Sequence, residues 1–526
     1  MRPLALLAAG VLVAACDFAP PKPDLNPPLP PSKPAAATPG KSAALPGEDV
    51  LAHRPGIPPL GAFDAPVPSV LTLPTGLKLY VVHRPSAGLE ALAFISRQGT
   101  AADPPGKEGL ASLAASMLQA GSAGKSQAEI AAAADALGAN LAVRAGPDAL
   151  TIGLSALAPR LPEMAALLAD VALRPNLAPD DWRKIQAQRL AELTANLSQP
   201  RVAAQAAFLA AVYGNGPLGH LPPGTLASVK GLGLRDVKAF LATLSPGDSA
   251  IVAVGGVAPD AVRSAVERAF GAWKGSGQRA PRRRTEAPPA RRPRFVLVDY
   301  PTKPQSVLVV GQPAVPRSSP DVLALELANA VVGGSFTSRL NQNLREKNGY
   351  SYGAGSFFAF GRGPGPFEAR TSVQTDVTGK AVTEVFGELQ RLVAEPLSAE
   401  ELEKGKALLA FGLVEALQSV DATTQAVGEL FVFDLPLDEY RTFVPRLREL
   451  TSSAVQDAVR RVLDPVKMTL AIAGDAQAVV PQLSAESTLG LPAPQMRNAE
   501  GQPAGRTKPV VTAGGASGRS QTTQRR

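Results

Sequence analysis

The sequence has a single cysteine, Cys16, and only three histidines, His53, His83 and His220. One cysteine excludes an intrachain disulfide, so the folded parts must be held together by packing alone. No two of the histidines lie at the spacing of metal ligands, and we expect each to be an ordinary surface or loop residue. After residue 16, no apolar run approaches the length of a transmembrane helix.

The first 16 residues have the pattern of a bacterial export signal. Arg2 supplies the charged start, residues 4–13 form an apolar stretch too short to span a bilayer, and small residues follow. The stretch Val13-Ala14-Ala15-Cys16 resembles the lipobox, in which the cysteine becomes the lipidated first residue of the mature protein. The alternative is an ordinary cleaved signal followed by an isolated thiol.

A lipidated Cys16 predicts that the protein is anchored in the cell envelope of a Gram-negative-type bacterium and faces the periplasm. Asp17 resembles an inner-membrane retention signal of some bacteria. Because that rule differs between lineages, the inner and the outer membrane both stay open.

The net charge of +8 comes mainly from one segment. Seven arginines and one glutamate lie between Arg279 and Arg294 and give that stretch a net charge of +6, so the rest of the chain is nearly neutral. A basic, proline-rich run of this kind is typical of a solvated linker, with contact to anionic lipid or to a partner as the alternative. The charge distribution therefore gives no reason to expect a nucleic-acid partner.

A chain of 526 residues is too long for one hydrophobic core and predicts two or three domains. Two blocks have the mixed helix and strand patterns of α+β domains, and the segments around them are rich in Pro, Gly, Ser or Arg. We expect a signal peptide (1–16), a proline-rich tether (17–66), a first domain (67–275), an Arg/Pro linker (276–293), a second domain (294–486) and a disordered tail (487–526).

Local patterns in the first block predict alternating strands and helices. Apolar and β-branched runs predict strands at 77–82, 92–96, 141–143 and 150–154. Ser126 and Glu129 form a capping box that opens an alanine-rich helix, and Asp180 or Asp181 is expected to cap a further helix that ends before Pro200.

Three landmarks of the first block return in the same order in the second, which predicts an internal duplication. Pro175 corresponds to Pro396 at a shift of 221 residues, the run starting at Ile251 to that starting at Leu470 at a shift of 219, and Gly121 to Gly334 at a shift of 213. Each match is short, but their common order favours two homologous halves.

The start of the first block resembles the insulinase/pitrilysin family of zinc peptidases, the inverted zincins. The residues that carry the resemblance are Leu73-Pro74-Thr75-Gly76-Leu77 leading into a strand, and then Gly106-Lys107-Glu108-Gly109-Leu110-Ala111. The resemblance implies a fold of the mitochondrial-processing-peptidase type. Such a fold has two homologous α/β-layered halves, each a mixed or antiparallel sheet packed with helices.

The zinc motif that the family carries next, His-x-x-Glu-His, is absent. Its two histidines and its glutamate, which bind zinc and act as general base in active members, are replaced by Ser112, Ser116 and Ala115. The family's third ligand would fall on Glu192, and a single carboxylate cannot hold zinc. We therefore expect no metal or other cofactor on this chain. Ser112 or Ser116 as a nucleophile would need a base, which the surrounding stretch does not supply.

The second block keeps a different part of the family pattern. The stretch from Leu344 to Tyr352 matches the signature in which an arginine and a tyrosine seven residues later reach toward the substrate, which implies this role for Arg345 and Tyr352. Both side chains can donate hydrogen bonds to a peptide carbonyl or carboxylate. The alternative is an ordinary helix end, with Asn348-Gly349 as a left-handed stop and Tyr352 at the start of a buried strand.

A chain that keeps the anchoring pair and lacks the metal ligands resembles the non-catalytic subunit of heterodimeric bacterial members. This resemblance implies a partner subunit that carries the zinc, and an extended peptide as substrate. A stand-alone peptide-binding protein is the second hypothesis, and a purely structural role, as in the core subunits of respiratory complexes, is the third. Independent peptidase activity is the least favoured.

Overall fold

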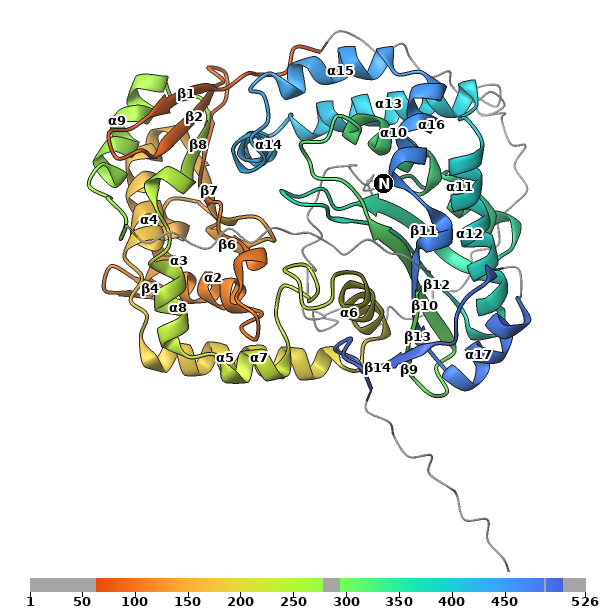
Figure 1. The fold of residues 1–526 in the computed structure, drawn as a ribbon. Coiled ribbons are helices and arrows are strands. Elements are labelled where there is room, and N and C mark those ends of the chain that lie inside the picture. Colours follow the sequence, from red (N-terminus) through yellow and green to blue (C-terminus); the bar gives the residue numbers. More distant parts are fainter. Residues whose placement is uncertain (1–62, 278–293, 487–488, 505–526) are drawn as a thin grey trace, which may run out of the picture.

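The computed structural model describes residues 63–277, 294–486 and 489–504. They form two halves, each built on a six-stranded sheet covered by helices (Figure 1). The predicted signal peptide with Cys16, residues 17–62 of the predicted tether and nearly all of the Arg/Pro linker lie outside the described residues. None of the described helices combines the length and the apolar character needed to cross a bilayer.

The first sheet has the strand order β1-β2-β8-β3-β7-β6 and is mixed. Strand β2 runs parallel to β8, and the other pairs are antiparallel. Its strands are β1 (Ser69–Thr72), β2 (Lys78–His83), β3 (Leu89–Ser96), β6 (Ala142–Ala145), β7 (Leu150–Leu157) and β8 (Ser249–Gly255). The four strands expected from the apolar runs are thereby confirmed as β2, β3, β6 and β7. Every residue of β8 is buried, because helices cover both faces of this sheet.

Helices of the first half pack mainly on one face of its sheet, where α4 and α9 form a core with β2, β3, β7 and β8. A two-stranded hairpin, β4 (Gly121–Ser122) and β5 (Lys125–Ser126), follows α2. The helices are α2 (Leu110–Ala120), α3 (Gln127–Ala136), α4 (Leu161–Leu173), α5 (Pro179–Asn196), α6 (Pro200–Tyr213), α7 (Leu226–Gly231), α8 (Leu234–Leu241) and α9 (Pro259–Phe270).

The predicted capping box is confirmed at α3, where the Ser126 side chain accepts from the Glu129 backbone and Glu129 accepts in return. The cap expected at Asp180 or Asp181 is wrong. The N-cap of α5 is Ala178, and Pro179 is the first helical residue, because its fixed φ and missing N–H suit that position. Both aspartates lie in the first turn, where a negative charge favours the helix dipole.

The second sheet has the order β11-β12-β10-β13-β9-β14, and its first five strands repeat the arrangement of β6, β7, β3, β8 and β2. The sixth strand differs, because β14 is parallel to β9 whereas β1 is antiparallel to β2. Strand β13 is parallel to β9 and antiparallel to β10, as β8 is to β2 and β3. The strands are β9 (Arg294–Asp299), β10 (Gln305–Pro313), β11 (Ser351–Phe358), β12 (Pro366–Gln374), β13 (Thr469–Gly474) and β14 (Gln495–Arg497). This shared order is consistent with the predicted duplication and with a fold of two similar halves.

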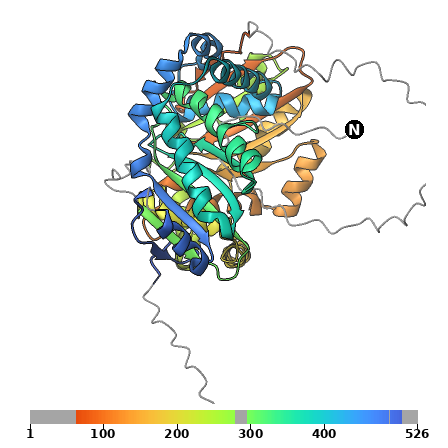
Figure 2. The same cartoon turned by 90° about the vertical axis from the view of Figure 1, so that its right-hand side faces the viewer.

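The outer helices of the second half lie over one face of its sheet, and this layer of helices faces the viewer in Figure 2. They enclose a core with β9, β10 and β12. The helices of this half are α10 (Val322–Val332), α11 (Arg339–Asn341), α12 (Thr378–Ala394), α13 (Ala399–Ala416), α14 (Val420–Val432), α15 (Glu439–Glu449), α16 (Ser452–Val462) and α17 (Ala476–Ala485).

The two halves exchange one helix each (Figure 1). Helix α6 belongs to the first half in sequence but packs on the second sheet, where Phe208 joins Val309 and Ala471 in one core. Helix α14 packs on the first sheet through Val427 and Phe431. Each sheet is therefore covered on its second face by a helix from the other half, which interlocks the two.

The close approach of α14 to the first sheet depends on Gly428. A Cβ at this position would lie 2.5 Å from Cδ1 of Ile95 on β3. Arg84 holds the start of the same helix, because its guanidinium donates to the carbonyl of Leu417 at 2.7 Å and to the Thr423 hydroxyl at 2.9 Å.

The predicted disordered tail from residue 487 is wrong for residues 489–504. Strand β14 pairs in parallel with β9 at the edge of the second sheet. After it, the Glu500 carboxylate accepts from the backbone N–H of Leu226 at 2.6 Å, at the start of α7. The few apolar residues of this segment concealed the strand, because an edge strand is held by backbone hydrogen bonds more than by burial.

Candidate functional site

Helix α2 carries the positions at which the family's zinc motif would stand. Asp103 caps its start, since its carboxylate accepts from the backbone N–H groups of Gly109 at 2.8 Å and Ala111 at 2.9 Å. Gly109 has a φ of 94°, and a Cβ there would lie 2.5 Å from the carbonyl oxygen of Pro223. The chain therefore enters α2 pressed against the loop before α7.

Burial raises the pKa of Asp103 to about 7, although its backbone hydrogen bonds from Ala111 and Gly109 act in the opposite direction. Asp103 as a whole is only 2% exposed. The charge state of this cap is therefore sensitive to pH near neutrality.

The three side chains that replace the zinc motif serve the packing of α2. The Ser112 hydroxyl donates to the carbonyl of Pro222 at 2.7 Å and so ties the helix to the loop before α7. The Ser116 hydroxyl donates to the carbonyl of Ser112, one turn earlier, at 3.1 Å. Ala115 is buried in the core of the first half.

Glu192, at the position of the third zinc ligand, lies on α5, which packs against α2. Its carboxylate forms an ion pair with Nε of Arg189, one turn away on the same helix, at 3.1 Å. Glu192 is half-exposed, and its partner is a cation rather than a metal-binding side chain.

This set of side chains does not fit a zinc ion. Two hydroxyls that donate to backbone carbonyls and a methyl group stand where two imidazoles and a carboxylate would be needed. Nowhere in residues 63–277, 294–486 and 489–504 do three His, Cys, Asp or Glu side chains gather in a way that could hold a metal. His83 ends β2, His220 lies in the loop before α7, and His53 falls outside the described residues.

Arg345 lies in the π-helical turn Gln342–Lys347, which continues α11. Its guanidinium carbon sits 4.2 Å from the ring centroid of Phe336, within the range of a cation–π contact. It also forms an ion pair at 3.5 Å with its neighbour Glu346. The Phe336 ring is 68% exposed, so the two side chains form an exposed apolar and cationic surface.

Tyr352 is 92% exposed, and a bulge in β11 explains its direction. Between Ser351, which pairs with Val373, and Ala354, which pairs with Thr371, two residues of β11 oppose one of β12. The Ser351 hydroxyl fixes the bulge by donating to the carbonyl of Gly353 at 2.6 Å and accepting from its N–H at 3.0 Å.

The stretch from Leu344 to Tyr352 had two interpretations, a substrate-anchoring pair and an ordinary helix end, and the structure agrees with the second only in part. The helix does end at Gly349 in a left-handed conformation, with a φ of 65°, as an ordinary stop would. Tyr352, however, does not begin a buried strand, because its side chain projects into solvent from the edge strand of the sheet. A phenol so exposed contributes little to the core and is available to a ligand.

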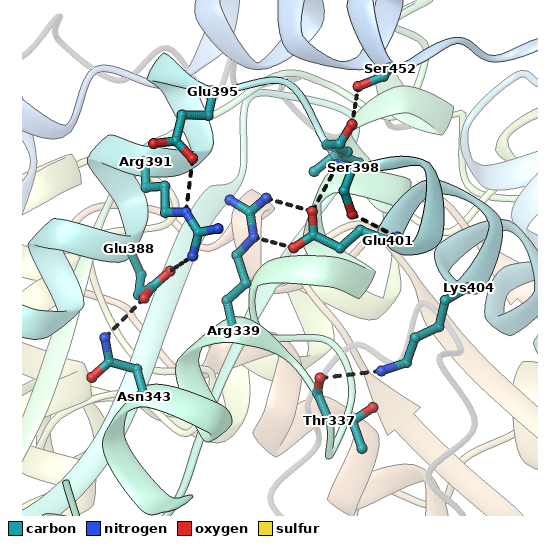
Figure 3. A network of polar contacts seen from close by, with 11 residues as sticks. Thr337, Arg339, Asn343, Glu388, Arg391, Glu395, Ser398, Glu401, Lys404 and Ser452 are labelled. Atoms are coloured by element: carbon teal, nitrogen blue, oxygen red, sulfur yellow. Dashed lines mark hydrogen bonds and ion pairs between the residues drawn. The ribbon is translucent and has the colours of Figure 1, made fainter. Parts of the chain in front are cut away.

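Sequence reasoning did not find a network of polar contacts that joins α11, α12 and α13 (Figure 3). Arg339 forms two hydrogen bonds with Glu401 on α13, from Nε at 2.7 Å and from Nη2 at 2.8 Å. The hydrogen bonds from Arg339 lower the pKa of Glu401 to about 2. Only the capping box of Ser398 and Glu401 gave a local signal for this network.

The hairpin loops next to the two edge strands meet between the halves. The carboxylate of Asp148, between β6 and β7, accepts from the backbone N–H of Arg362 at 3.1 Å, between β11 and β12. The Tyr213 hydroxyl of α6 donates to the carbonyl of Pro364 at 3.0 Å. The edge strands β6 and β11, one from each half, therefore end at a shared contact.

Two family models match the chain in succession. The model described as insulinase (peptidase family M16) matches residues 83–221, and the model described as peptidase M16 inactive domain matches residues 232–409. Together they cover more than half of the sequence.

Relatives that match over most of their own length are described as uncharacterized zinc proteases. One from Mycobacterium tuberculosis (strain H37Rv) is 26% identical over 401 residues, which cover 74% of this chain and 89% of the relative. YmxG of Bacillus subtilis is 22% identical over 390 residues, which cover 72% of this chain and 91% of the relative.

Solved structures show the same fold. The peptidase M16 inactive domain from Pseudomonas fluorescens aligns with a TM-score of 0.73 at 25% identity, over 78% of this chain and 98% of its own. A protease from Helicobacter pylori aligns with a TM-score of 0.74 at 17% identity, over 78% of this chain and 100% of its own.

Proposed function

Because the chain belongs to the insulinase family of peptidases (M16) but lacks its zinc-binding side chains, we propose that it is the non-catalytic subunit of a heterodimeric zinc peptidase. In this proposal a partner of the same family carries the zinc, and this chain supplies Arg345 and Tyr352 as substrate anchors. One observation carries the proposal: the side chains on α2 cannot bind metal, while Tyr352 is held almost fully exposed on a bulge beside the Arg345 turn.

The anchoring role follows from the chemistry of the two groups. A guanidinium and a phenol both donate hydrogen bonds, and a peptide carbonyl accepts them. Strand β11 is at the edge of its sheet, so an extended peptide can add to it through backbone hydrogen bonds. The Phe336 ring under Arg345 offers an apolar contact to a substrate side chain.

The test is a comparison of the chain alone with the chain and its captured partner. The tagged full-length chain is purified from its own host in mild detergent, zinc is measured by mass spectrometry, and cleavage is followed with a quenched peptide library. We expect zinc and cleavage only in the sample that contains a partner with His-x-x-Glu-His. Arg345→Ala and Tyr352→Phe should each lower kcat/KM about 10-fold or more.

Arg263→Ala is the matched control, because Arg263 lies on α9, is also solvent-exposed and pairs with Glu267 on its own helix. It should leave cleavage unchanged. If no partner is captured and neither sample cleaves, the proposal fails in favour of a stand-alone peptide-binding or scaffold protein. Chelator-sensitive cleavage by the chain alone would overturn both.

We also propose that Cys16 anchors this subunit to a membrane, with the folded halves in the periplasm. The motif around Cys16 and its place directly after the apolar stretch support this. Replacing Cys16 with Ser should move the protein from the membrane to the soluble fraction, and separation of inner from outer membranes would identify the membrane that holds it. Unchanged membrane fractionation of the Ser variant would refute the anchor.

A further inference from the structure

The Arg345 and Tyr352 side chains stand on short elements that have little regular structure of their own. Phe336 lies in the turn after α10, Arg345 in a single π-helical turn, and Tyr352 in a bulge. Such elements hold a fixed geometry only when other groups determine it. The short helix α11, residues Arg339–Asn341, lies between the Phe336 turn and the Arg345 turn. Its side chains make the contacts that hold these turns and the bulge in place.

Arg339 ties α11 to α13. Its side chain is 5% exposed, and its two hydrogen bonds to Glu401 have the parallel geometry of a bidentate pair. Glu401 is itself fixed, because the backbone N–H of Ser398 donates to it at 2.9 Å in the capping box of α13. Lys404, one turn further along α13, donates to the carbonyl of Thr337 at 3.4 Å (Figure 3).

Asn341 ties α11 to the two neighbouring elements. Its amide nitrogen donates to the carbonyl of Ser335 at 3.2 Å and to the Ser338 hydroxyl at 3.3 Å, next to Phe336. Its amide oxygen accepts from the backbone N–H of Ala354 at 2.9 Å, directly after the bulge that carries Tyr352. One buried side chain thus sets the distance between the Phe336 turn and β11.

Stability alone does not account for the Arg339 pair. Its buried Nη1 has no hydrogen-bond partner among the described residues. Arg339 is buried and the Glu401 side chain is 27% exposed. Such a pair with an unsatisfied buried donor is a poor stabiliser, and apolar side chains of similar size often serve the core as well or better. What apolar side chains cannot supply is a fixed direction, which a bidentate pair does.

We propose that Arg339, held by Glu401, is a positioning residue for Phe336, Arg345 and Tyr352. In this scheme Asn341 fixes β11 relative to α11 through its hydrogen bond with Ala354. The inference rests on the proposed anchoring function of Arg345 and Tyr352. Neither Arg339 nor Asn341 contacts the substrate in this scheme, since both are buried.

The experiment uses the full-length chain in detergent and two readouts. Amide hydrogen exchange is measured for peptides covering residues 333–341 and 350–356, and binding is measured by anisotropy with a fluorescein-labelled pool of random 12-residue peptides. Arg339→Met removes both hydrogen bonds, and Arg339→Lys keeps the charge but not the bidentate geometry. Lys406→Met is the matched control, because it removes a buried cation of helix α13 whose hydrogen bonds go to Glu403 and to the carbonyl of Arg448.

We expect Arg339→Met to speed exchange in both segments and to weaken peptide binding about 10-fold or more, with Arg339→Lys between it and the unmodified chain. Combining Arg339→Met with Tyr352→Ala should weaken binding no further than the stronger single change, because both remove the same contact. Lys406→Met should change neither readout, even if it lowers the melting temperature as much.

Additive effects of the Arg339 and Tyr352 changes, or unchanged exchange in 350–356, would overturn the inference. If Arg339→Met does not fold, Arg339→Lys and Glu401→Gln test the same contact with smaller changes. If Arg345→Ala and Tyr352→Ala leave binding unchanged, the anchoring function itself fails, and the exchange data still decide whether Arg339 positions these segments.

Discussion

Ser112, Ala115 and Ser116 place two hydroxyls and a methyl group on the face of α2 where active relatives of the family hold zinc. The hydroxyls are engaged with the carbonyls of Pro222 and Ser112, so they contribute to the packing of α2 against the next loop. The absence of the metal site is therefore a property of single residues. It was readable from the sequence because the motif consists of neighbouring turns of one helix.

The direction of the Tyr352 side chain, unlike the missing metal site, could not be read from the sequence. Its place in the family pattern was visible in the sequence, but the exposure of its side chain depends on a bulge between β11 and β12. Ser351 and Thr371 stabilise the bulge across the strand pair, with their hydroxyls 2.8 Å apart. A contact across 20 residues leaves no periodic signal in the sequence, so the direction of the phenol could not be predicted.

Asp103 predicts a pH dependence of stability. Its ordinary pKa is 3.8, and burial raises it to about 7 in the folded protein, so the folded state binds the proton more tightly than the unfolded state. The contribution of the protonated Asp103 to the free energy of unfolding is fully present below pH 3.8 and is lost as the pH rises toward 7. We expect the urea midpoint to fall between about pH 4 and about pH 7, and Asp103→Asn to flatten this slope.

Asp180→Asn is the control for this measurement, because Asp180 is an exposed aspartate in the first turn of α5. It should leave the pH slope as it is. An Asp103→Asn variant with the slope of the unmodified chain would show that the Asp103 carboxyl is not the titrating group.

At the scale of secondary-structure elements, the exchange of α6 and α14 is the feature that joins the halves. Each helix covers an otherwise apolar sheet face, and polar contacts secure both. The Gln205 amide of α6 donates to the buried Glu368 of β12 at 3.0 Å. Arg97, which follows β3, lies over the ring of Phe431 on α14, with its guanidinium carbon 4.3 Å from the ring centroid.

The burial of Phe431 leads us to expect that α14 contributes strongly to the free energy of unfolding. Its ring is 1% exposed and meets Tyr80 edge-on at a centroid distance of 6.1 Å. Phe431→Ala should lower the free energy of unfolding by about 3–5 kcal/mol, because it leaves a cavity between the halves. Urea unfolding followed by tryptophan fluorescence measures the loss.

Phe411→Ala is the matched control, since Phe411 lies on the neighbouring helix α13 and is 49% exposed. Its loss should be within about 1 kcal/mol. A loss for Phe431→Ala as small as that of the control would mean that α14 adds little to the stability of the first sheet.

At the scale of the whole molecule, the exchange predicts that neither half folds alone. Without α14, the first half exposes the face of its sheet that carries Ile95 and Val252, and the second half without α6 exposes Val309 and Ala471. Such apolar faces favour aggregation. We expect residues 63–277 and 294–504 to be insoluble or to bind a hydrophobic dye when expressed separately, and to form a soluble pair when expressed together.

The measurement is solubility and dye binding, with near-ultraviolet circular dichroism as a test of fixed packing. A separately expressed half with native-like circular dichroism would contradict the prediction. The C-terminal segment strengthens the expectation, because Gly501 packs so closely on α6 that a Cβ there would lie 2.4 Å from the carbonyl oxygen of Ala206.

The sequence by itself determined the features that depend on neighbouring residues. Four strands of the first half, the capping box at Ser126, the repeated order of landmarks and the missing zinc motif were readable, because each is set by local periodicity or by residue chemistry at fixed spacing. The proline at position 179 displaced the predicted cap by only a short distance, because proline and aspartate both favour helix starts.

Only the tertiary structure decided which elements meet. The exchange of α6 and α14, the pair of Arg339 with Glu401 across 62 residues, and the strand β14 in a tail expected to be disordered all depend on contacts between distant segments. A local pattern shows that a face is apolar or that a side chain is charged. It does not show which of several apolar faces or partners the chain brings against it, because that choice is made by the packing of the whole molecule.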